Sequence, residues 1–307
     1  MRIDERIATG KGPSFSFEFF PPKTEAGTRN LEEALSALSA LDPTFVSVTY
    51  GAGGSPAEKV KTVDIVSHMK RDFGLEAMAH FTCVGATVAE LRETLDLMRD
   101  RGVENVLALR GDPPQGQSEW TATEGGLRYS RELVELIREE YDFSIGAACF
   151  PEVHIHATDA ESDLRYTKEK VDAGAGFLIT QLFYDNRCYY EFVERAREIG
   201  IDVPIIPAVI PISTYGQVER ICKLCDAEIP TDLSAAMESL GGDEEAERLL
   251  GVAYAARQCE ELLAAGAPGI HFIALNRASG TRAVLAALHA SRPWERAEAG
   301  EAVRTYT

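Results

Sequence analysis

Glu18 is the polar residue of this chain that points most directly to chemistry, because it interrupts an apolar run, Ser16-Phe17-Glu18-Phe19-Phe20. If the run is a barrel strand and Glu18 faces inward, its carboxyl group is buried. Burial beside aromatic rings raises the pKa of a carboxyl group and keeps it protonated near neutral pH, the state that a general acid requires. The alternative is an outward-facing glutamate paired with a lysine of a neighbouring helix.

Further polar residues follow other short apolar runs. Asp112 comes directly after an Arg-Gly pair, and the glycine lets backbone approach a ligand, although an Arg–Asp turn ion pair explains the sequence equally well. His80 and His154 are either satisfied core histidines or ligand contacts. Gln181 lies in an apolar run, where a buried amide needs hydrogen-bond partners that a heterocycle would supply.

The elements that must position these residues alternate regularly. Strands that alternate with helices imply right-handed crossovers and a parallel sheet, and eight such units fit a closed barrel with its catalytic groups at the carboxyl ends of the strands. We therefore predict one α/β domain over residues 1–307, a (β/α)8 barrel of the TIM type with extra helices before the last strand. An open doubly wound sheet is disfavoured because no GxGxxG follows the first strand. The predicted strands are 14–20, 45–50, 76–82, 105–109, 144–150, 177–183, 203–209 and 269–275, and the extra helices are 212–226, 230–240 and 244–265.

Composition argues against several classes of protein. A net charge of -18 disfavours nucleic-acid binding and requires local cations for any anionic ligand. Lys170 could be one, although a solvated charged face also explains its helical spacing from Asp163. The chain has no apolar run long enough for a membrane helix and no signal-peptide core, so we expect a cytoplasmic protein without a membrane segment. The six cysteines are expected to be reduced, and the lone CxxC of Cys222 and Cys225 to be two helix residues rather than a zinc or redox site.

Several ordered motifs closely resemble the bacterial methylenetetrahydrofolate reductases. The resemblance implies a β/α barrel that carries FAD and reduces 5,10-methylenetetrahydrofolate to 5-methyltetrahydrofolate with NADH or NADPH, feeding methionine synthesis. Hydride would pass from the nicotinamide to FAD and then to the folate, which occupies the same space. A bacterial type favours NADH, and we expect a homo-oligomer. The motifs are FEFFPP at 17–22, VSVTYGA at 46–52, ALRGD at 108–112, PEVH at 151–154, KVDAGA at 170–175, ITQ at 179–181 and LNRA at 275–278.

The resemblance also implies roles for single residues. Glu18 would protonate the folate N10 as the five-membered ring opens, and Asp112 would hold the pterin and tune the flavin. The folate site would comprise Asp112, Gln181, Gln217 and Arg277, with Gln181 also facing the nicotinamide. The flavin site would comprise Thr49, Tyr50, Ala52, His80, Arg110, Gly111, Asp112, Tyr129, Ser130, Phe150, His154, Ala157, Asp163, Tyr166 and Lys170.

Two positions depart from the family pattern. Phe150 stands where bacterial members often have tyrosine, which could cost one hydrogen bond of about 1 kcal/mol, and Ile221 stands where well-known members have a stacking phenylalanine. Two other functions stay open: a flavin-free folate reductase or folate-binding barrel, and a metal-dependent hydrolase that uses His154 and His156 as ligands. The chain leaves no room after the barrel for the regulatory domain of the eukaryotic relatives, so we expect no regulation of that kind.

Overall fold

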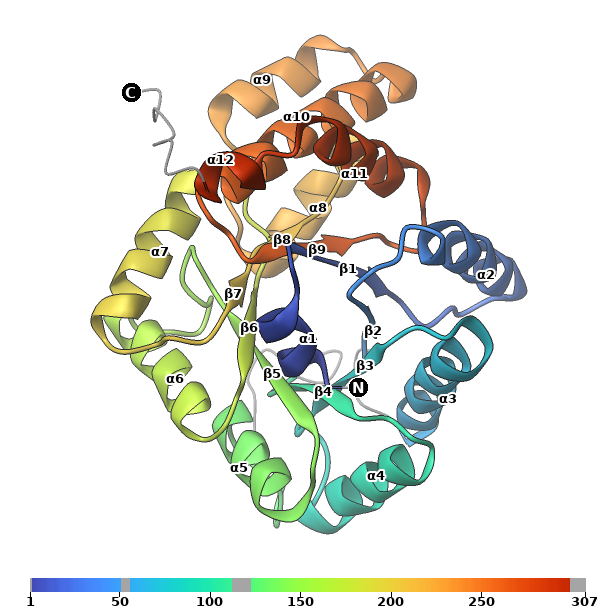
Figure 1. Cartoon of the computed structure of the whole chain (residues 1–307), viewed down its shortest axis with the longest axis vertical. Helices are drawn as coiled ribbons and strands as arrows, with labels where there is room; N and C mark the ends of the chain where they lie inside the picture. Colours follow the sequence, from blue (N-terminus) through green and yellow to red (C-terminus); the bar gives the residue numbers. More distant parts are fainter. Residues whose placement is uncertain (1, 51–55, 112–122, 299–307) are drawn as a thin grey trace.

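The chain folds into a barrel of parallel strands with α-helices outside it (Figure 1). The structure is a computed structural model, and it describes residues 2–50, 56–111 and 123–298. Neighbouring strands pair in the order β7-β6-β5-β4-β3-β2-β1-β9-β8. The strands are β1 Ser14–Phe19, β2 Phe45–Val48, β3 Ala77–Thr82, β4 Asn105–Leu109, β5 Ser144–Cys149, β6 Phe177–Thr180, β7 Ile205–Ile206, β8 Ala208–Val209 and β9 Gly269–Ile273.

The two shortest strands, β7 and β8, are halves of one barrel position. They are separated by Pro207, which has no N–H group to donate to a ladder. β7 pairs with β6 and β8 pairs with β9, so this stretch joins the two ends of the sheet. Counted as one, the strands occupy eight positions, and each lies within the range predicted from the sequence. The predicted TIM-type barrel is confirmed.

Helices follow the strands around the outside of the barrel. Three of them, α8, α9 and α10, lie between β8 and β9 and confirm the extra helices predicted before the last strand. Cys222 and Cys225 are residues of α8, as predicted, and all six cysteines are free thiols. The helices of this layer are α2 Glu25–Ser39, α3 Pro56–Phe73, α4 Val88–Asp100, α5 Ser130–Glu140, α6 Ala160–Asp172, α7 Asn186–Glu198, α8 Tyr215–Cys225, α9 Thr231–Ser239, α10 Glu244–Ala264, α11 Ser279–Ser291 and α12 Trp294–Glu298.

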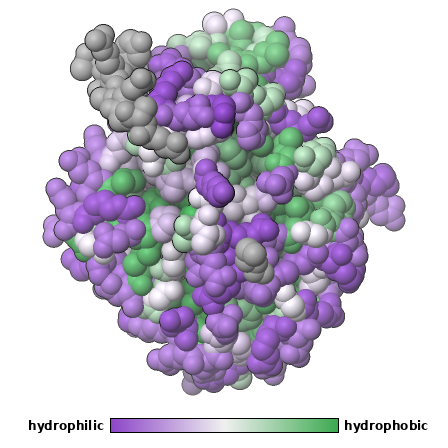
Figure 2. Space-filling view, in the orientation of Figure 1, coloured by the Kyte–Doolittle hydropathy of each residue, from purple (hydrophilic) through white to green (hydrophobic). Residues whose placement is uncertain are grey.

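A helix that the sequence did not predict, α1 Ile3–Thr9, covers the amino-terminal end of the barrel (Figure 1). Ile3 is fully buried and packs with interior residues such as Phe45 and Met78. Its backbone N–H donates to Oδ1 of Asn105 at 2.8 Å. The surface around this end is mostly hydrophilic (Figure 2). With this end covered by α1, ligands are expected at the opposite end, where the strands have their carboxyl termini.

The strand β1 divides its side chains between two environments. Successive residues of a strand point to opposite faces, so Phe17 and Phe19 share one side and Ser16 and Glu18 the other. Both phenylalanines are fully buried in the large apolar cluster that joins the strands to the helix layer. Ser16 and Glu18 therefore face the barrel interior.

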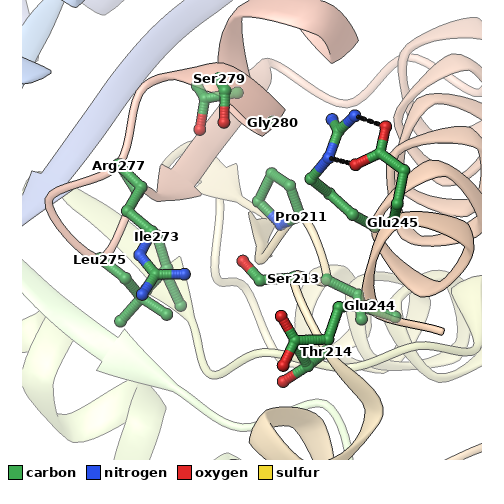
Figure 3. A pocket seen from close by; sticks show the side chains of 14 residues that line it. Pro211, Ser213, Thr214, Glu244, Glu245, Ile273, Leu275, Arg277, Ser279 and Gly280 are labelled. Atoms are coloured by element: carbon green, nitrogen blue, oxygen red, sulfur yellow. Dashed lines mark hydrogen bonds and ion pairs between the residues drawn. The ribbon is translucent and has the colours of Figure 1, made fainter. Parts of the chain in front are cut away.

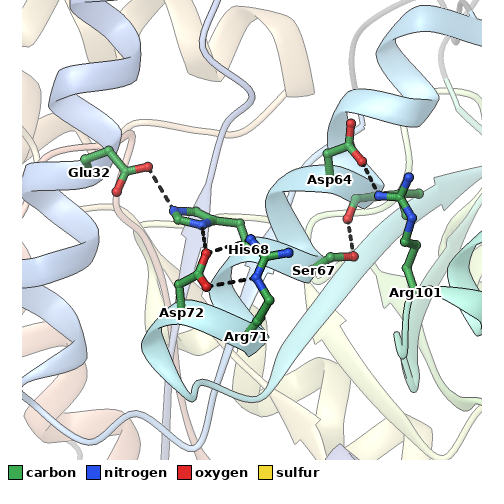
Figure 4. A network of polar contacts seen from close by, with 8 residues as sticks. Glu32, Asp64, Ser67, His68, Arg71, Asp72 and Arg101 are labelled. Atoms are coloured by element: carbon green, nitrogen blue, oxygen red, sulfur yellow. Dashed lines mark hydrogen bonds and ion pairs between the residues drawn. The ribbon is translucent and has the colours of Figure 1, made fainter.

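Ion pairs link neighbouring helices on the surface (Figure 4). His68 of α3 lies 3.1 Å from a carboxylate oxygen of Glu32 on α2 and 2.5 Å from one of Asp72, while Arg101 reaches Asp64 at 2.6 Å. Exposed pairs of this kind stabilise a fold by about 1 kcal/mol at most, so apolar packing holds the helix layer. Among the residues described, no helix combines the length and apolar character needed to cross a membrane.

Candidate active site

Five polar side chains meet inside the barrel, and we call them the Glu18 cluster: Ser16, Glu18, Ser47, His80 and His271. The ring of His271 is central, with Nε2 3.3 Å from Oε2 of Glu18 and Nδ1 2.7 Å from Oγ of Ser16. Nε2 of His80 lies 3.4 Å from the same Glu18 oxygen and 3.3 Å from Oγ of Ser47. Two imidazole rings therefore converge on one carboxylate oxygen.

Strand register brings these residues together. Ser16 pairs with His271 across β1 and β9, and Glu18 pairs with Ser47 across β1 and β2. The ring of His271 also stacks on Phe45, with centroids 5.7 Å apart and planes inclined by 18°. The imidazole is thus fixed by hydrogen bonds at both nitrogens and by a ring face.

Glu18 is the member of the cluster most open to solvent. Its side chain is 12% exposed, against 8% for His80 and 0% for His271. Because Glu18 lies near the carboxyl end of β1, this exposure faces the end of the barrel where ligands are expected. A substrate at the mouth can meet the Glu18 carboxyl group, with the two histidines behind it.

The pKa of Glu18 lies below its ordinary value. Burial by itself would raise this pKa, but the hydrogen bond with His271 and the electrostatic interactions with His80 and His271 lower it more. The expected raised pKa is therefore wrong for the ligand-free protein. The reason is strand alternation, which turns Phe17 and Phe19 toward the helices and surrounds the carboxyl group with imidazoles instead. Glu18 is an anion at neutral pH until a ligand changes its surroundings.

His80 is held neutral. Burial, together with the charge of His271, lowers its pKa to about 4 against the opposing effect of Glu18. A neutral ring has one donor and one acceptor nitrogen, so His80 can orient the serine hydroxyl and carboxylate without carrying charge. His80 was predicted as a ligand contact, and it lies beside the proposed acid.

His271, Ser16 and Ser47 were not predicted as site residues from the sequence. A signal was present, because His271 lies between Ile270 and Phe272 in an apolar strand, as Glu18 does between phenylalanines. What was missing was the register that places the two strands side by side.

Asn276 fastens the turn after β9 to the end of β1. Its amide nitrogen donates to the backbone oxygen of Phe20 and its amide oxygen accepts from the Phe20 N–H, both at 2.9 Å. Leu275 and Asn276 both have left-handed backbone conformations, with φ of 49° and 55°, which non-glycine residues rarely adopt. Strain of this kind persists where surrounding contacts fix it, and here the contact lies two residues from Glu18.

A second group of predicted residues gathers beyond β5. Nζ of Lys170 donates to the backbone oxygen of Ala148 at 2.5 Å and lies 5.8 Å from the ring centroid of Phe150. The ring of His154 packs edge-on against Phe150 at 4.5 Å, and the His154 N–H donates to Oδ2 of Asp163 at 3.3 Å. Lys170 and Asp163 are both buried on one face of α6, so the solvated-face interpretation is wrong.

Charge in this group is poorly compensated. Burial lowers the pKa of Lys170, and burial together with the positive charges of Arg110, His156 and Lys170 lowers that of His154 to about 4. Burial raises the pKa of Asp163. In the part of the chain that the structure describes, no carboxylate lies within ion-pair distance of Lys170. A buried cation in this state fits an anionic ligand such as a diphosphate.

The backbone of Gly111 packs closely against the end of β3 and the residues that follow it. Gly111 has φ of +92°, and a Cβ there would lie 2.4 Å from Cγ1 of Val84, so the position requires glycine. The hydroxyl of Thr82, at the end of β3, is buried without a hydrogen-bond partner among the described residues. Glycine at position 111 therefore serves the packing of the segment after β4 against Thr82 and Val84.

The other predicted residues occupy strand ends or the helices that follow them. Thr49 and Tyr50 follow β2, Tyr129 and Ser130 begin α5, and Tyr129 and Tyr166 are about half exposed. Gln181 follows β6, and its Oε1 accepts from the Leu182 N–H at 2.9 Å. Of the remaining positions, Arg110 follows β4, Ala157 follows β5, Arg277 follows β9, and Gln217 lies on α8, one helical turn before Ile221. Ala52 and Asp112 lie outside the described residues.

The histidine pair proposed for a metal does not form a ligand set within the described residues. The backbone N–H of His156 donates to Nδ1 of His154 at 3.0 Å, which occupies one of the two ring nitrogens. No group of three His, Cys, Asp or Glu side chains in the described ranges is placed to hold a metal ion.

Comparison with known proteins agrees with the motifs. Residues 2–289 match the family model described as methylenetetrahydrofolate reductase. The chain is 41% identical over 290 residues to methylenetetrahydrofolate reductase (NADH) 1 of Arabidopsis thaliana, covering 90% of this chain but 49% of that protein. It therefore spans about half the length of the plant relatives. It is 39% identical over 283 residues to 5,10-methylenetetrahydrofolate reductase of Salmonella typhimurium, covering 92% of this chain and 93% of that one.

A solved structure shows the same fold at low identity. It is an uncharacterized protein from Clostridium thermocellum, described as binding two copies of 5-methyl-5,6,7,8-tetrahydrofolic acid. The TM-score is 0.63 at 16% identity, with 94% of this chain and 99% of that chain covered.

Proposed function

The chain belongs to the methylenetetrahydrofolate reductase family, and from this premise we propose that it reduces 5,10-methylenetetrahydrofolate to 5-methyltetrahydrofolate with NADH or NADPH through FAD. The observation that carries the proposal is the Glu18 cluster, a partly exposed carboxylate at the barrel mouth with two imidazoles behind it. Reduction of this substrate opens a ring at a nitrogen, and the departing nitrogen needs a proton. The Glu18 carboxyl group, hydrogen-bonded to His271, is the group proposed to carry this proton.

The residues around β3, β4, β5 and α6 fit a flavin dinucleotide. Lys170 supplies a buried cation for the diphosphate. Bound FAD would supply hydride transfer between nicotinamide and folate. Tyr129 and Tyr166 present exposed rings next to this region, and Phe150 packs apolar surface where relatives often have a hydroxyl.

Glu18 must gain a proton before it can donate one. A substrate that covers the barrel mouth removes the remaining solvent contact of the carboxylate, and this desolvation raises its pKa. His271 then keeps the protonated group in place, because its Nε2 and Nδ1 are bonded to Glu18 and Ser16. The carboxyl group can pass its proton to N10 of the folate, while Gln181, Gln217 and Arg277 hold the rest of the molecule.

Spectroscopy and one substitution test the proposal. Purified protein should show flavin absorbance that bleaches with NADH or NADPH and recovers on addition of methylenetetrahydrofolate. Glu18→Gln should keep the flavin and its bleaching but lose folate reduction by about 100-fold or more, the usual contribution of a general acid. Glu76→Gln, a buried glutamate at the opposite end of the barrel, is the matched control and should reduce folate normally.

Each contrary outcome has a distinct meaning. Folate reduction at the normal rate by Glu18→Gln would remove Glu18 from the mechanism. Folate reduction by protein without flavin absorbance would support the flavin-free reductase instead. A cytoplasmic homo-oligomer built from a single barrel domain completes the proposal, and sedimentation of the purified protein tests the oligomer.

A further inference from the structure

The segment that connects β8 to α8 lies at the barrel mouth. Figure 3 shows Pro211, Ser213 and Thr214 of this segment between the first turn of α10 and the turn that follows β9. Together these elements line a cavity of about 330 Å³. The helix α8 begins directly after the segment, at Tyr215, and carries Gln217 in its first turn. The position of Gln217 therefore depends on how this first turn is held.

The first turn of α8 has little stability of its own. Among the described residues, the side chain of its N-cap, Thr214, caps no N–H group of the turn. The second residue of the helix is Gly216, which is exposed. Glycine is among the least favourable residues within a helix, because its backbone loses the most conformational freedom there. The turn therefore needs support from neighbouring elements.

A buried glutamate of α10 supplies this support. Oε2 of Glu247 accepts a hydrogen bond from the backbone N–H of Tyr215 at 2.9 Å, and Glu247 is 6% exposed. The first N–H groups of a helix have no partner within the helix, and a carboxylate near them also interacts favourably with the helix dipole. Glu247 thus takes the place of the missing N-cap from a different helix.

Two further contacts hold the same part of the chain. Gly251 follows Glu247 by four residues and therefore lies on the same face of α10. A Cβ at Gly251 would lie 2.4 Å from the backbone oxygen of Ile212, so the backbone of α10 packs directly on the segment before α8. The hydroxyl of Tyr215 lies 2.7 Å from Oγ of Ser234 on α9. The first turn of α8 is therefore held from both α9 and α10.

We infer that Glu247 is a positioning residue for folate reduction, which holds the first turn of α8 and, through this turn, the amide of Gln217. The inference rests on the proposed function, in which Gln217 binds the folate, and adds a residue that acts through Gln217. Since Gln217 belongs to the folate site, loss of Glu247 should weaken the binding of methylenetetrahydrofolate. It should leave the reduction of the flavin by NADH unchanged.

Glu247→Leu is the first variant, because leucine fills a similar volume and cannot accept a hydrogen bond. The KM for methylenetetrahydrofolate should rise about tenfold, the equivalent of about 1.4 kcal/mol, while the rate of flavin bleaching by NADH stays the same. A residue that only supports the fold would instead lower both half-reactions in proportion and leave this KM unchanged. Glu247→Gln keeps an oxygen acceptor for the Tyr215 N–H, so its KM should stay close to that of the wild type.

A double-mutant cycle tests whether Glu247 acts through Gln217. Gln217→Ala removes the amide and should by itself raise the KM for methylenetetrahydrofolate about tenfold, the equivalent of about 1.4 kcal/mol. Adding Glu247→Leu to this variant should produce little further rise, because the effects of coupled residues do not add. Glu260→Leu is the matched control, since Glu260 lies on the same helix, pairs with Arg296 at 3.4 Å and should leave both half-reactions unchanged.

Glu247→Asp tests the inference if the leucine variant does not fold. Aspartate keeps the charge, but its side chain is one methylene shorter, so the carboxylate lies further from the Tyr215 N–H. The KM for methylenetetrahydrofolate should rise by a smaller factor, again without a change in flavin bleaching.

Three results would overturn the inference: an unchanged KM in the leucine variant, or in the aspartate variant if leucine prevents folding; equal losses in the two half-reactions; or KM increases that add fully in the cycle. Each differs from a failure of the proposed function, in which the wild-type protein itself would not reduce methylenetetrahydrofolate.

Discussion

Replacing His271 with phenylalanine should move the pH dependence of folate reduction toward higher pH. Phenylalanine can keep the stack on Phe45 but removes the hydrogen bond and the electrostatic interaction that hold the pKa of Glu18 low. A hydrogen bond to a charged group is worth about 1.5–3 kcal/mol, so its loss raises the pKa of Glu18. Donation requires the protonated carboxyl group, so kcat/KM for folate falls tenfold per pH unit above this pKa.

The assay is kcat/KM for methylenetetrahydrofolate between pH 5.5 and 9, in the wild type and in His271→Phe. The wild type should already decline across this range, because its Glu18 pKa is low, while the decline of the variant should begin at higher pH. Bleaching of the flavin by NADH serves as the control and should keep its pH profile. Ser16→Ala, which loosens the ring at Nδ1 without removing it, should give a smaller displacement in the same direction.

A loss of activity alone would say little, because a damaged core also lowers rates. The informative quantity is the position of the decline on the pH axis. A variant whose profile coincides with that of the wild type, or lies at lower pH, would refute the claim that His271 sets the pKa of Glu18.

Three further predictions concern the residues around the site. The pKa of His80 is lowered from 6.5 to about 4, so as the pH falls the unfolded chain binds this proton before the folded protein does. The free energy of unfolding should therefore fall by up to about 3 kcal/mol between pH 6.5 and pH 4. Urea titrations should show a smaller loss of stability at acid pH in His80→Gln than in the wild type. Lys170→Met should weaken flavin binding about 10- to 100-fold by titration while leaving the ligand-free protein as stable or more stable, since a buried charge is removed. Asn276→Gly suits the left-handed backbone but deletes two hydrogen bonds, so the free energy of unfolding should change by only about 1 kcal/mol while kcat for folate falls and flavin bleaching by NADH does not; equal losses in both steps would contradict a role next to Glu18.

The barrel was predictable because its signals are local. Each strand is a short apolar run bounded by an amphipathic stretch, and eight repeats leave few arrangements once crossovers must be right-handed. The helix α1 was not predicted because its seven residues show too little hydrophobic periodicity to distinguish a helix from a loop. The break at Pro207 was similarly invisible, since it depends on which neighbour each half of the strand pairs with.

The site was predictable in position more than in electrostatics. Glu18 was found because a carboxylate in an apolar strand stands out in any sequence, and the strand count placed it at the barrel mouth. Its pKa was predicted in the wrong direction because the side chains of adjacent strand residues point to opposite faces of the sheet, so the flanking phenylalanine rings do not surround the carboxyl group. Its real neighbours come from β3 and β9, 62 and 253 positions further along the chain, as His80 and His271.

The strand β9 and its turn connect the two halves of the chemistry. His271 lowers the pKa of Glu18, Asn276 bonds the backbone of Phe20 two residues beyond it, and Arg277 lines a cavity together with the first turn of α11. These residues lie within seven positions of one another, on a segment whose left-handed turn leaves little freedom to adjust. In the proposed function, a substrate held by Arg277 therefore contacts the same turn that bonds the backbone of Phe20, two residues from the proton donor. Binding of the far end of the substrate can in this way improve alignment at its reacting end, which is how remote binding energy becomes catalytic rate.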